Sequence, residues 1–304
     1  MTADHYHVPV LPAVVAGLAQ GRRRVVDGTV GGGGHAALFR AAGARVLAVD
    51  RDPEALAAAR LRLGDDGIDW CQGTFADPAV LDRVRAFRPD LVLLDLGVSS
   101  HQLDVDRRGF SFREGVPLDM RMEPGGASAG DLLNHASGDT LADIFHTYAD
   151  ERRARRLART IVERRARSPL TTSDDLVAAI RRALGPRTGP ADFARLFQAI
   201  RIAVNQELEQ LASALPALRD ALVPSGVLAV ITYHSGEDRI VKDAFREWGR
   251  ACICPPAQPI CTCRGHPLGR VETRKPLRPD AQEMAVNPRA RSAKLRVFRR
   301  ADGD

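Results

Sequence analysis

Short apolar runs separated by helical patterns fill the first third of the chain. Runs at residues 25–26, 45–50, 68–71 and 91–95 are rich in branched aliphatic residues, which predicts strands. Between them, residues 53–63 and 80–87 carry apolar positions three or four residues apart, which predicts helices. The run at 91–95 is almost wholly apolar, as is typical of a central parallel strand covered on both faces. This alternation predicts a doubly wound α/β sheet.

The pattern changes after about residue 109. Residues 109–126 are turn-rich, and residues 128–205 carry apolar stripes at helical spacing. Strand-like runs return at residues 227–233, 271–273 and 295–298, and we expect the last two to form an antiparallel pair at the sheet edge. We therefore expect a sheet domain made of residues 1–118 and 206–304, with an all-helical insertion at 119–205.

Composition narrows the class of protein. The 304 residues are 44% hydrophobic and 27% charged, which is ordinary for a globular chain. The sequence shows neither an apolar run near the ~18 residues of a membrane span nor a secretion signal, so we expect a cytoplasmic protein without a membrane partner. The net charge of +6 favours polyanionic partners. Eight arginines lie between Arg152 and Arg167, and eleven basic residues lie between Arg264 and Arg300.

The first chemical signal follows the first expected strand. Asp27 is followed by a glycine cluster that ends at Gly34, and a helix beginning there would point backbone N–H groups at a ligand. The second strand ends in Asp50, close to the ~20-residue interval at which a carboxylate meets ribose hydroxyls. An acid at Asp27 would repel a dinucleotide phosphate but suits the sulfonium and ammonium groups of S-adenosylmethionine. A nicotinamide-dependent oxidoreductase and a glycine turn that binds nothing are the alternatives.

Polar residues also follow the third and fourth expected strands. Methyltransferases that act on amino groups place a short polar motif after the fourth strand. The reason is that an exocyclic base amine attacks poorly until a hydrogen-bond acceptor draws its lone pair out of conjugation with the ring. Asp95 and Ser99 are candidates for that catalytic acceptor, and a plain strand-end cap is the alternative for Asp95. Phe75 either stacks on an adenine ring or closes the core.

Longer motifs resemble one known family, the bacterial 16S ribosomal RNA cytosine-N4 methyltransferases. The motifs run from His7-Val8-Pro9 through Asp27-Gly28-Thr29, Leu94-Asp95-Leu96-Gly97-Val98-Ser99-Ser100, Pro117-Leu118-Asp119-Met120-Arg121-Met122, Phe197-Gln198-Ala199-Ile200-Arg201 and Tyr233-His234-Ser235 to Asn287-Pro288-Arg289-Ala290-Arg291-Ser292.

The resemblance implies a class I S-adenosylmethionine methyltransferase with a Rossmann-like sheet and a helical substrate domain. Its expected substrate is a cytidine N4 amine in 16S rRNA near the decoding centre. The cofactor contacts that it implies fall on Gly33, Gly34, His35, Asp50, Phe75, Asp95 and Gln102. A non-catalytic ribosome assembly factor of the same fold is the alternative, and both a monomer and a homodimer remain open.

Four cysteines form a separate pattern, Cys252-x-Cys254-x6-Cys261-x-Cys263. Four thiols within twelve residues match the donor number of a structural zinc site, although a spacing of one residue is tighter than usual. Disulfides are disfavoured in a reducing cytoplasm. A zinc site and an unliganded surface loop stiffened by Pro255, Pro256 and Pro259 are therefore both open, and we assign no metal to the catalytic site.

Overall fold

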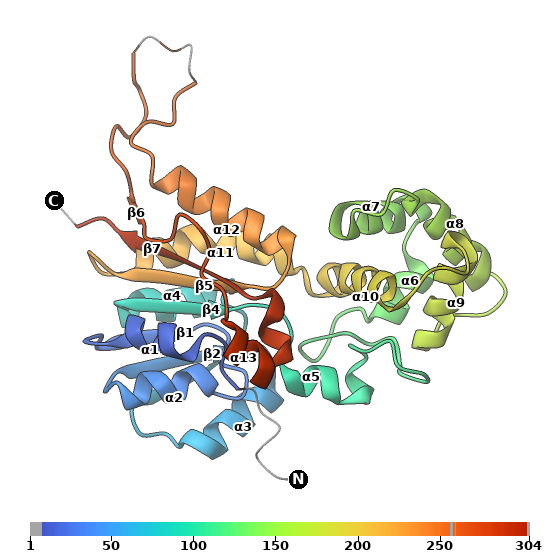
Figure 1. Ribbon diagram of the computed structural model, residues 1–304, viewed down its shortest axis with the longest axis horizontal. Coiled ribbons are helices and arrows are strands. Elements are labelled where there is room, and N and C mark those ends of the chain that lie inside the picture. Colours follow the sequence, from blue (N-terminus) through green and yellow to red (C-terminus); the bar gives the residue numbers. More distant parts are fainter. Residues whose placement is uncertain (1–7, 256–257, 259, 303–304) are drawn as a thin grey trace. The chain divides into compact units, whose positions relative to one another are not determined.

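The computed structural model describes residues 8–255, 258 and 260–302, so His7, Pro256 and Pro259 lie outside the described residues (Figure 1). The chain divides into two compact units, one of residues 1–97 and 208–304 and the other of Val98–Glu207. The second unit starts at Val98, earlier than the expected residue 119. The turn-rich segment before residue 119 belongs to it because the Ser173 amide donates to the Val116 carbonyl at 2.7 Å.

The first unit is built on one mixed sheet. Among the described residues it has seven strands in the order β3-β2-β1-β4-β5-β7-β6. The strands are β1 (Arg24–Asp27), β2 (Arg45–Asp50), β3 (Ile68–Gln72), β4 (Leu91–Asp95), β5 (Val227–Thr232), β6 (Gly269–Val271) and β7 (Lys294–Arg300). Strands β1 to β5 run parallel, whereas β7 pairs antiparallel with both β5 and β6. The expected α/β fold class is confirmed, and so is the antiparallel edge pair, although β6 begins earlier than expected.

Helices cover both faces of this sheet (Figure 1). Successive strand residues point to opposite faces, so Leu93 joins one core and Leu94 the other. The first face packs against α1 (Pro12–Ala19), α2 (Gly34–Ala41), α3 (Pro53–Leu63) and the turn η3 (Pro288–Ser292). The second face packs against α4 (Pro78–Phe87), α11 (Glu207–Ala221) and α12 (Ser235–Trp248). A short helix, α13 (Ala281–Val286), precedes η3.

The second unit consists of helices around a core of its own. Its elements are α5 (Ser100–Asp104), η2 (Asp106–Arg108), α6 (Ala129–His135), α7 (Gly138–Ala149), α8 (Ala154–Arg165), α9 (Ser173–Leu184) and α10 (Pro190–Asn205). Phe145, Leu157 and Ile180 are fully buried in that core. The Asp175 carboxylate accepts from the backbone N–H groups of Thr171 and Thr172, which closes a capping box at the start of α9.

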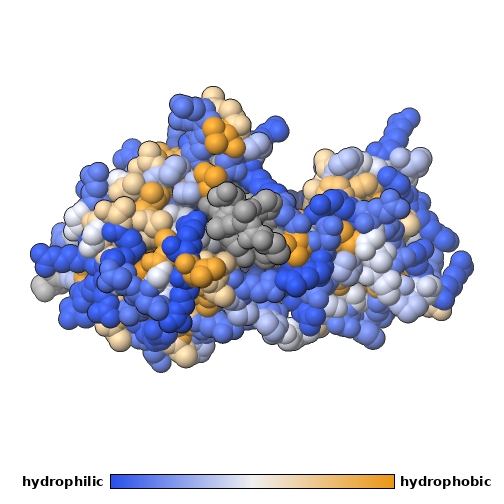
Figure 2. Space-filling view, turned by 90° about the horizontal axis from the view of Figure 1, so that it is seen from below, coloured by the Kyte–Doolittle hydropathy of each residue, from blue (hydrophilic) through white to orange (hydrophobic). Residues whose placement is uncertain are grey.

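Hydrophilic side chains dominate the face of each unit that Figure 2 shows, and hydrophobic residues are visible there only in small patches. In the part of the chain that the structure describes, none of the helices is long and apolar enough to cross a membrane.

Candidate active site at the carboxyl edge of the sheet

Three neighbouring strands end in aspartate. Strand β1 pairs in parallel with β2 on one side and with β4 on the other, and Asp27 lies level with Ala48 and Leu93. The carboxyl ends of parallel strands meet at one edge of a sheet, where doubly wound folds bind their ligands. The structure therefore brings Asp27, Asp50 and Asp95 to the same edge, and their charges interact.

The Asp27 carboxyl is fully buried. Its Oδ1 accepts from the Thr29 amide at 3.4 Å, and among the described residues no partner reaches Oδ2. Burial is the main reason that the pKa of Asp27 rises to about 8, with smaller contributions from the charges of Asp95 and Asp50. At neutral pH this group is therefore mostly protonated until a positive charge arrives nearby.

The Asp50 carboxylate is half-buried and fixed by backbone donors. Gly31 donates its N–H to Oδ2 at 2.8 Å, and Asp52 donates its N–H to Oδ1 at 2.9 Å. Burial raises the pKa of Asp50 to about 6, although these two hydrogen bonds work in the opposite direction. The carboxylate oxygens keep further lone pairs, so they can also accept from vicinal hydroxyl groups.

The Asp95 carboxylate lies between a tyrosine and a histidine, and its side chain is only 8% exposed. The Tyr233 hydroxyl donates to Oδ1 at 2.8 Å, and His35 Nδ1 lies 3.6 Å from Oδ2. His35 Nε2 is 2.9 Å from the Val10 carbonyl, which can only accept, so this ring nitrogen carries a proton. Burial and the adjacent Asp95 raise the pKa of Tyr233 well above its usual value, which keeps the hydroxyl protonated as a donor.

The glycine loop joins β1 to α2. Gly33 caps α2 with a φ of 78°, a left-handed conformation that favours glycine, and Gly34 is the first helical residue. A side chain at Gly28 is excluded because its Cβ would lie 2.5 Å from Leu94 Cδ2. At Gly31 an added Cβ would meet no atom within 4 Å, so the loop has open space beside its backbone.

The remaining predicted site residues lie in two places. Phe75 follows β3 in the sheet unit, is half-buried and packs against the core on the α4 side. Ser99 and Gln102 belong to the helical unit and form a reciprocal cap at α5. The Gln102 amide donates to the Ser99 hydroxyl at 3.2 Å, and the Ser99 amide donates to Gln102 Oε1 at 3.0 Å. The cofactor and catalytic roles of these three residues stay predictions.

Two residues at this edge escaped the sequence analysis. Tyr233 directly follows β5, and its position after a strand adjacent to β4 was the signal that could have identified it. The Thr29 hydroxyl accepts from the Asp95 amide at 2.7 Å and so joins the end of β4 to the glycine loop. The position of Thr29 two residues after Asp27, beside the glycine cluster, was the corresponding signal.

This arrangement suits a ligand with a positive charge and ribose hydroxyls. The unpartnered, buried Asp27 oxygen and the neighbouring carboxylates of Asp50 and Asp95 together favour a cation. The open space beside Gly31 lies next to the amide that fixes Asp50. S-adenosylmethionine, which carries a sulfonium, an ammonium and a ribose, fits these carboxyl groups, whereas a pyrophosphate would be repelled.

Comparisons with known proteins show what this chain is similar to. A curated relative from Gemmatimonas aurantiaca, named Ribosomal RNA small subunit methyltransferase H, is 56% identical and is matched over 97% of this chain and 96% of its own. A relative of the same name from Heliobacterium mobile is 45% identical over 97% of this chain and 98% of its own. A solved rRNA methylase from Streptococcus thermophilus is 12% identical with a TM-score of 0.42, covering 96% of this chain and 94% of that one. The model of the MraW methylase family matches residues 4–301, so the chain belongs to the MraW methylase family.

Proposed function

We propose that the protein is an enzyme that transfers a methyl group from S-adenosylmethionine to the N4 amine of a cytidine in 16S rRNA, near the decoding centre. The curated relatives are named as small-subunit rRNA methyltransferases, which supports the substrate class. The observation that carries the proposal is the set of three strand-end carboxylates, the buried Asp27 with Asp50 and Asp95 beside it. S-adenosylmethionine supplies the methyl group on a positively charged sulfur.

The surroundings of Asp50 and of the glycine loop support roles in cofactor binding. Asp50 is fixed to accept from ribose hydroxyls, and the backbone of Gly33 and Gly34 permits close approach at the start of α2. Phe75 offers an aromatic face for adenine. Asp95 holds the methionine end, and His35 acts by positioning Asp95. A cofactor contact of Gln102, which belongs to the helical unit, stays a prediction.

Catalysis by this chain is mainly positioning. Methyl transfer from a sulfonium is an in-line displacement, and correct alignment of two reactants contributes roughly 7 to 11 kcal/mol. Asp95 or Ser99 accepts a hydrogen bond from the cytidine amine. Tyr233 and Thr29 hold Asp95 at its side chain and its amide, and the Ser99 hydroxyl can still accept a second hydrogen bond.

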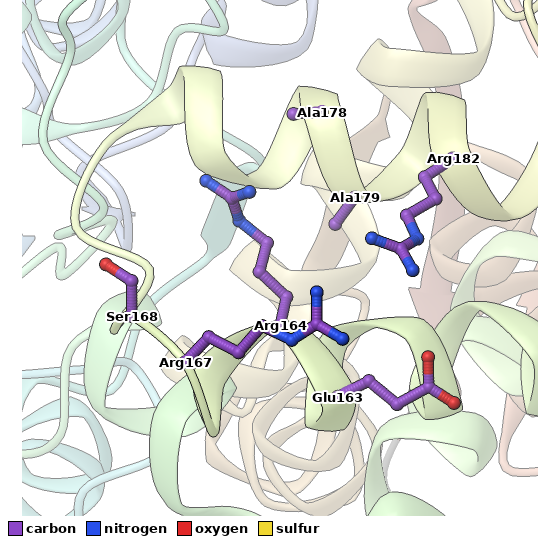
Figure 3. A pocket seen from close by; sticks show the side chains of 7 residues that line it. All are labelled: Glu163, Arg164, Arg167, Ser168, Ala178, Ala179 and Arg182. Carbon is purple, nitrogen blue, oxygen red and sulfur yellow. The ribbon is translucent and has the colours of Figure 1, made fainter.

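The helical unit offers a basic surface for rRNA. Arginines at positions 152, 155, 156, 159 and 167 on and around α8 are exposed. A pocket of about 110 Å³ between α8 and α9 is lined by Arg164, Arg167 and Arg182, together with Glu163 (Figure 3). Arg164 pairs with Asp175, whereas for Arg167 and Arg182 no ion pair is recorded among the described residues. We propose that these exposed arginines contact RNA phosphates.

The second basic region divides into two groups. Glu272 pairs with Arg270 and Arg299, and Asp238 pairs with Lys294 and Arg296, so these cations stabilise the sheet edge. The other exposed cations of this region are Arg274, Lys275, Arg278, Arg289 and Arg291. Only this smaller group is proposed to contact RNA. The proposed location is the cytoplasm, where the small subunit is the partner.

Incubation with labelled S-adenosylmethionine and undermodified small subunits tests the function. We expect label on a cytidine of 16S rRNA, mapped by nuclease digestion and mass spectrometry. Label on 23S rRNA, on protein or on nothing would overturn the proposal, and the last result would favour a non-catalytic assembly factor.

Binding at several salt concentrations tests the RNA surface. Affinity for the small subunit is expected to fall steeply with salt, and replacing Arg167 and Arg182 by Ala is expected to weaken binding and reduce the slope. Arg246→Ala, which removes an exposed arginine from α12 in the sheet unit, is the matched control and should leave the slope unchanged. An unchanged slope in the double variant would remove the α8–α9 pocket from the RNA surface.

A further inference from the structure

A long loop connects α12 to β6 and projects from the sheet (Figure 1). It carries Cys252, Cys254, Cys261 and Cys263, and none of these four thiols takes part in the site described above. Their sulfur atoms all lie within 4.8 Å of one another. The two Cys-x-Cys pairs therefore bring all four sulfur atoms together around one point.

The spacing of the sulfur atoms matches a tetrahedral metal site. Cys261 Sγ lies 3.5 Å from Cys263 Sγ, 3.7 Å from Cys252 Sγ and 3.9 Å from Cys254 Sγ. Four thiolates placed ~2.3 Å from a central Zn²⁺ at tetrahedral angles are separated from one another by about 3.8 Å. The three measured separations lie on either side of this value.

The same distances do not fit disulfides. A disulfide joins its sulfur atoms at about 2.0 Å, and all four cysteines are free in the structure. The Ile253 amide also donates to Cys263 Sγ at 3.4 Å, which is the kind of outer contact that stabilises a metal thiolate.

The loop lacks an apolar core that could hold this arrangement. None of its described residues between 250 and 267 is buried, and Ile253 and Ile260 are 42% and 73% exposed. Fixing each backbone residue costs roughly 1–2 kcal/mol, so a small ordered segment without a core needs another source of stability. Structural zinc sites supply folding free energy of this kind.

The base of the loop is fixed to the sheet unit. Arg264 Nη1 forms an ion pair with Glu247 at 2.7 Å, and Arg264 Nη2 donates to the Arg250 carbonyl at 3.0 Å. The Leu268 amide donates to the Trp248 carbonyl at 2.8 Å. These contacts bring the two legs of the loop together at its base.

We propose that Cys252, Cys254, Cys261 and Cys263 bind one structural Zn²⁺ as four thiolates. The site is closed, because four protein ligands complete the tetrahedral coordination of zinc and leave no position for substrate. Zinc binding displaces the thiol protons and involves no redox change. This proposal is independent of methyl transfer.

Metal analysis of the full-length, untagged protein, purified in reducing buffer without added metal, tests the proposal. We expect about one zinc per chain, released when a mercurial reagent blocks the thiols, as expected for a Cys₄ site. Replacement of zinc by Co²⁺ should give the intense visible absorption of tetrahedral cobalt thiolates. The Cys252→Ser/Cys261→Ser variant should lose both signals.

Cys71→Ala is the matched control, because it removes the fifth cysteine, which is buried in the sheet core, and should keep the zinc. Tryptophan fluorescence verifies that both variants retain a folded sheet unit. Negligible zinc after purification and reconstitution, or equal zinc in the double serine variant, would overturn the proposal. Iron with labile sulfide, or an intact mass showing disulfides in the freshly purified protein, would overturn it as well.

Discussion

Replacing Asp27 by Asn removes a buried carboxyl that the cofactor-free protein can ionise only at a cost in free energy. The carboxyl is fully buried, and one of its oxygens has no partner among the described residues. Asn has nearly the same shape and keeps a carbonyl oxygen to accept from the Thr29 amide. The variant should therefore be more stable than the parent without cofactor and should bind S-adenosylmethionine more weakly.

The pKa of Asp27 sets the size and sign of this effect. It rises from 3.8 to about 8, mainly through burial. Between these values the folded state keeps a proton that the unfolded state has lost, so the free energy of unfolding falls as pH rises. At ~1.36 kcal/mol for each pH unit, the ionisation of this group lowers the free energy of unfolding by about 2 kcal/mol between about pH 6 and pH 8. Asp27→Asn should abolish that part of the decrease.

Urea unfolding followed by tryptophan fluorescence measures the effect. The chain has two tryptophans, Trp70 on β3 and Trp248 at the end of α12, so the signal reports on the sheet unit. Asp50, whose pKa is raised to about 6, titrates in the same range, but it is common to both proteins, and only the difference between the two pH profiles is interpreted. Asp66→Asn is the matched control, because its carboxylate is fully exposed and should leave the profile unchanged.

Two results would refute this reasoning. One is a pH profile for Asp27→Asn that runs parallel to that of the parent protein, which would mean that Asp27 is ionised in both states. The other is undiminished affinity for S-adenosylmethionine in calorimetric titration, which would show that the buried charge does not contribute to cofactor binding. Stabilisation together with weaker binding would instead identify Asp27 as a strained functional group.

Three further substitutions test other parts of the sheet edge. Tyr233→Phe removes the hydroxyl that holds the carboxylate at the end of β4, and kcat/KM should fall by about 10- to 100-fold, the equivalent of ~1.5–3 kcal/mol, while the melting temperature stays near that of the parent. Asp50→Asn should raise the KM for S-adenosylmethionine much more than it lowers kcat, and an unchanged KM would argue against a ribose contact. Burial tends to raise the pKa of Asp238, but hydrogen bonds from Arg296 and Lys294 outweigh burial and lower it. Asp238→Asn should therefore destabilise the sheet unit at neutral pH, and the difference from the parent should shrink as acid protonates the carboxylate.

Much of the sheet unit could be predicted because its signals are local. Strands β2 and β4 have the predicted bounds, since apolar runs that end in an acid mark both the strand and its carboxyl end. The parallel arrangement then placed Asp50 and Asp95 at one edge. The long motifs also identified the family, which the family model and the curated relatives confirm.

Contacts between distant segments could not be predicted in the same way. The hydrogen bond between Tyr233 and Asp95 spans 138 positions and depends on β5 lying beside β4. The start of the helical unit at Val98 also depends on hydrogen bonds to α9, which no local pattern encodes. Likewise, the spacing of the four cysteines left two alternatives open, and the positions of their sulfur atoms support the proposal of one of them.

The insertion between neighbouring strands has a consequence for biosynthesis. Strand β4 pairs with β5, yet the whole of the helical unit is translated between them. A nascent chain therefore exposes β4 as an apolar sheet edge, a known starting point for aggregation, until β5 leaves the ribosome. The helical unit has its own core and can fold during that interval, which shortens the distance that loop closure must later span. The edge proposed to bind the cofactor is therefore completed late in synthesis, after the whole helical unit has been translated.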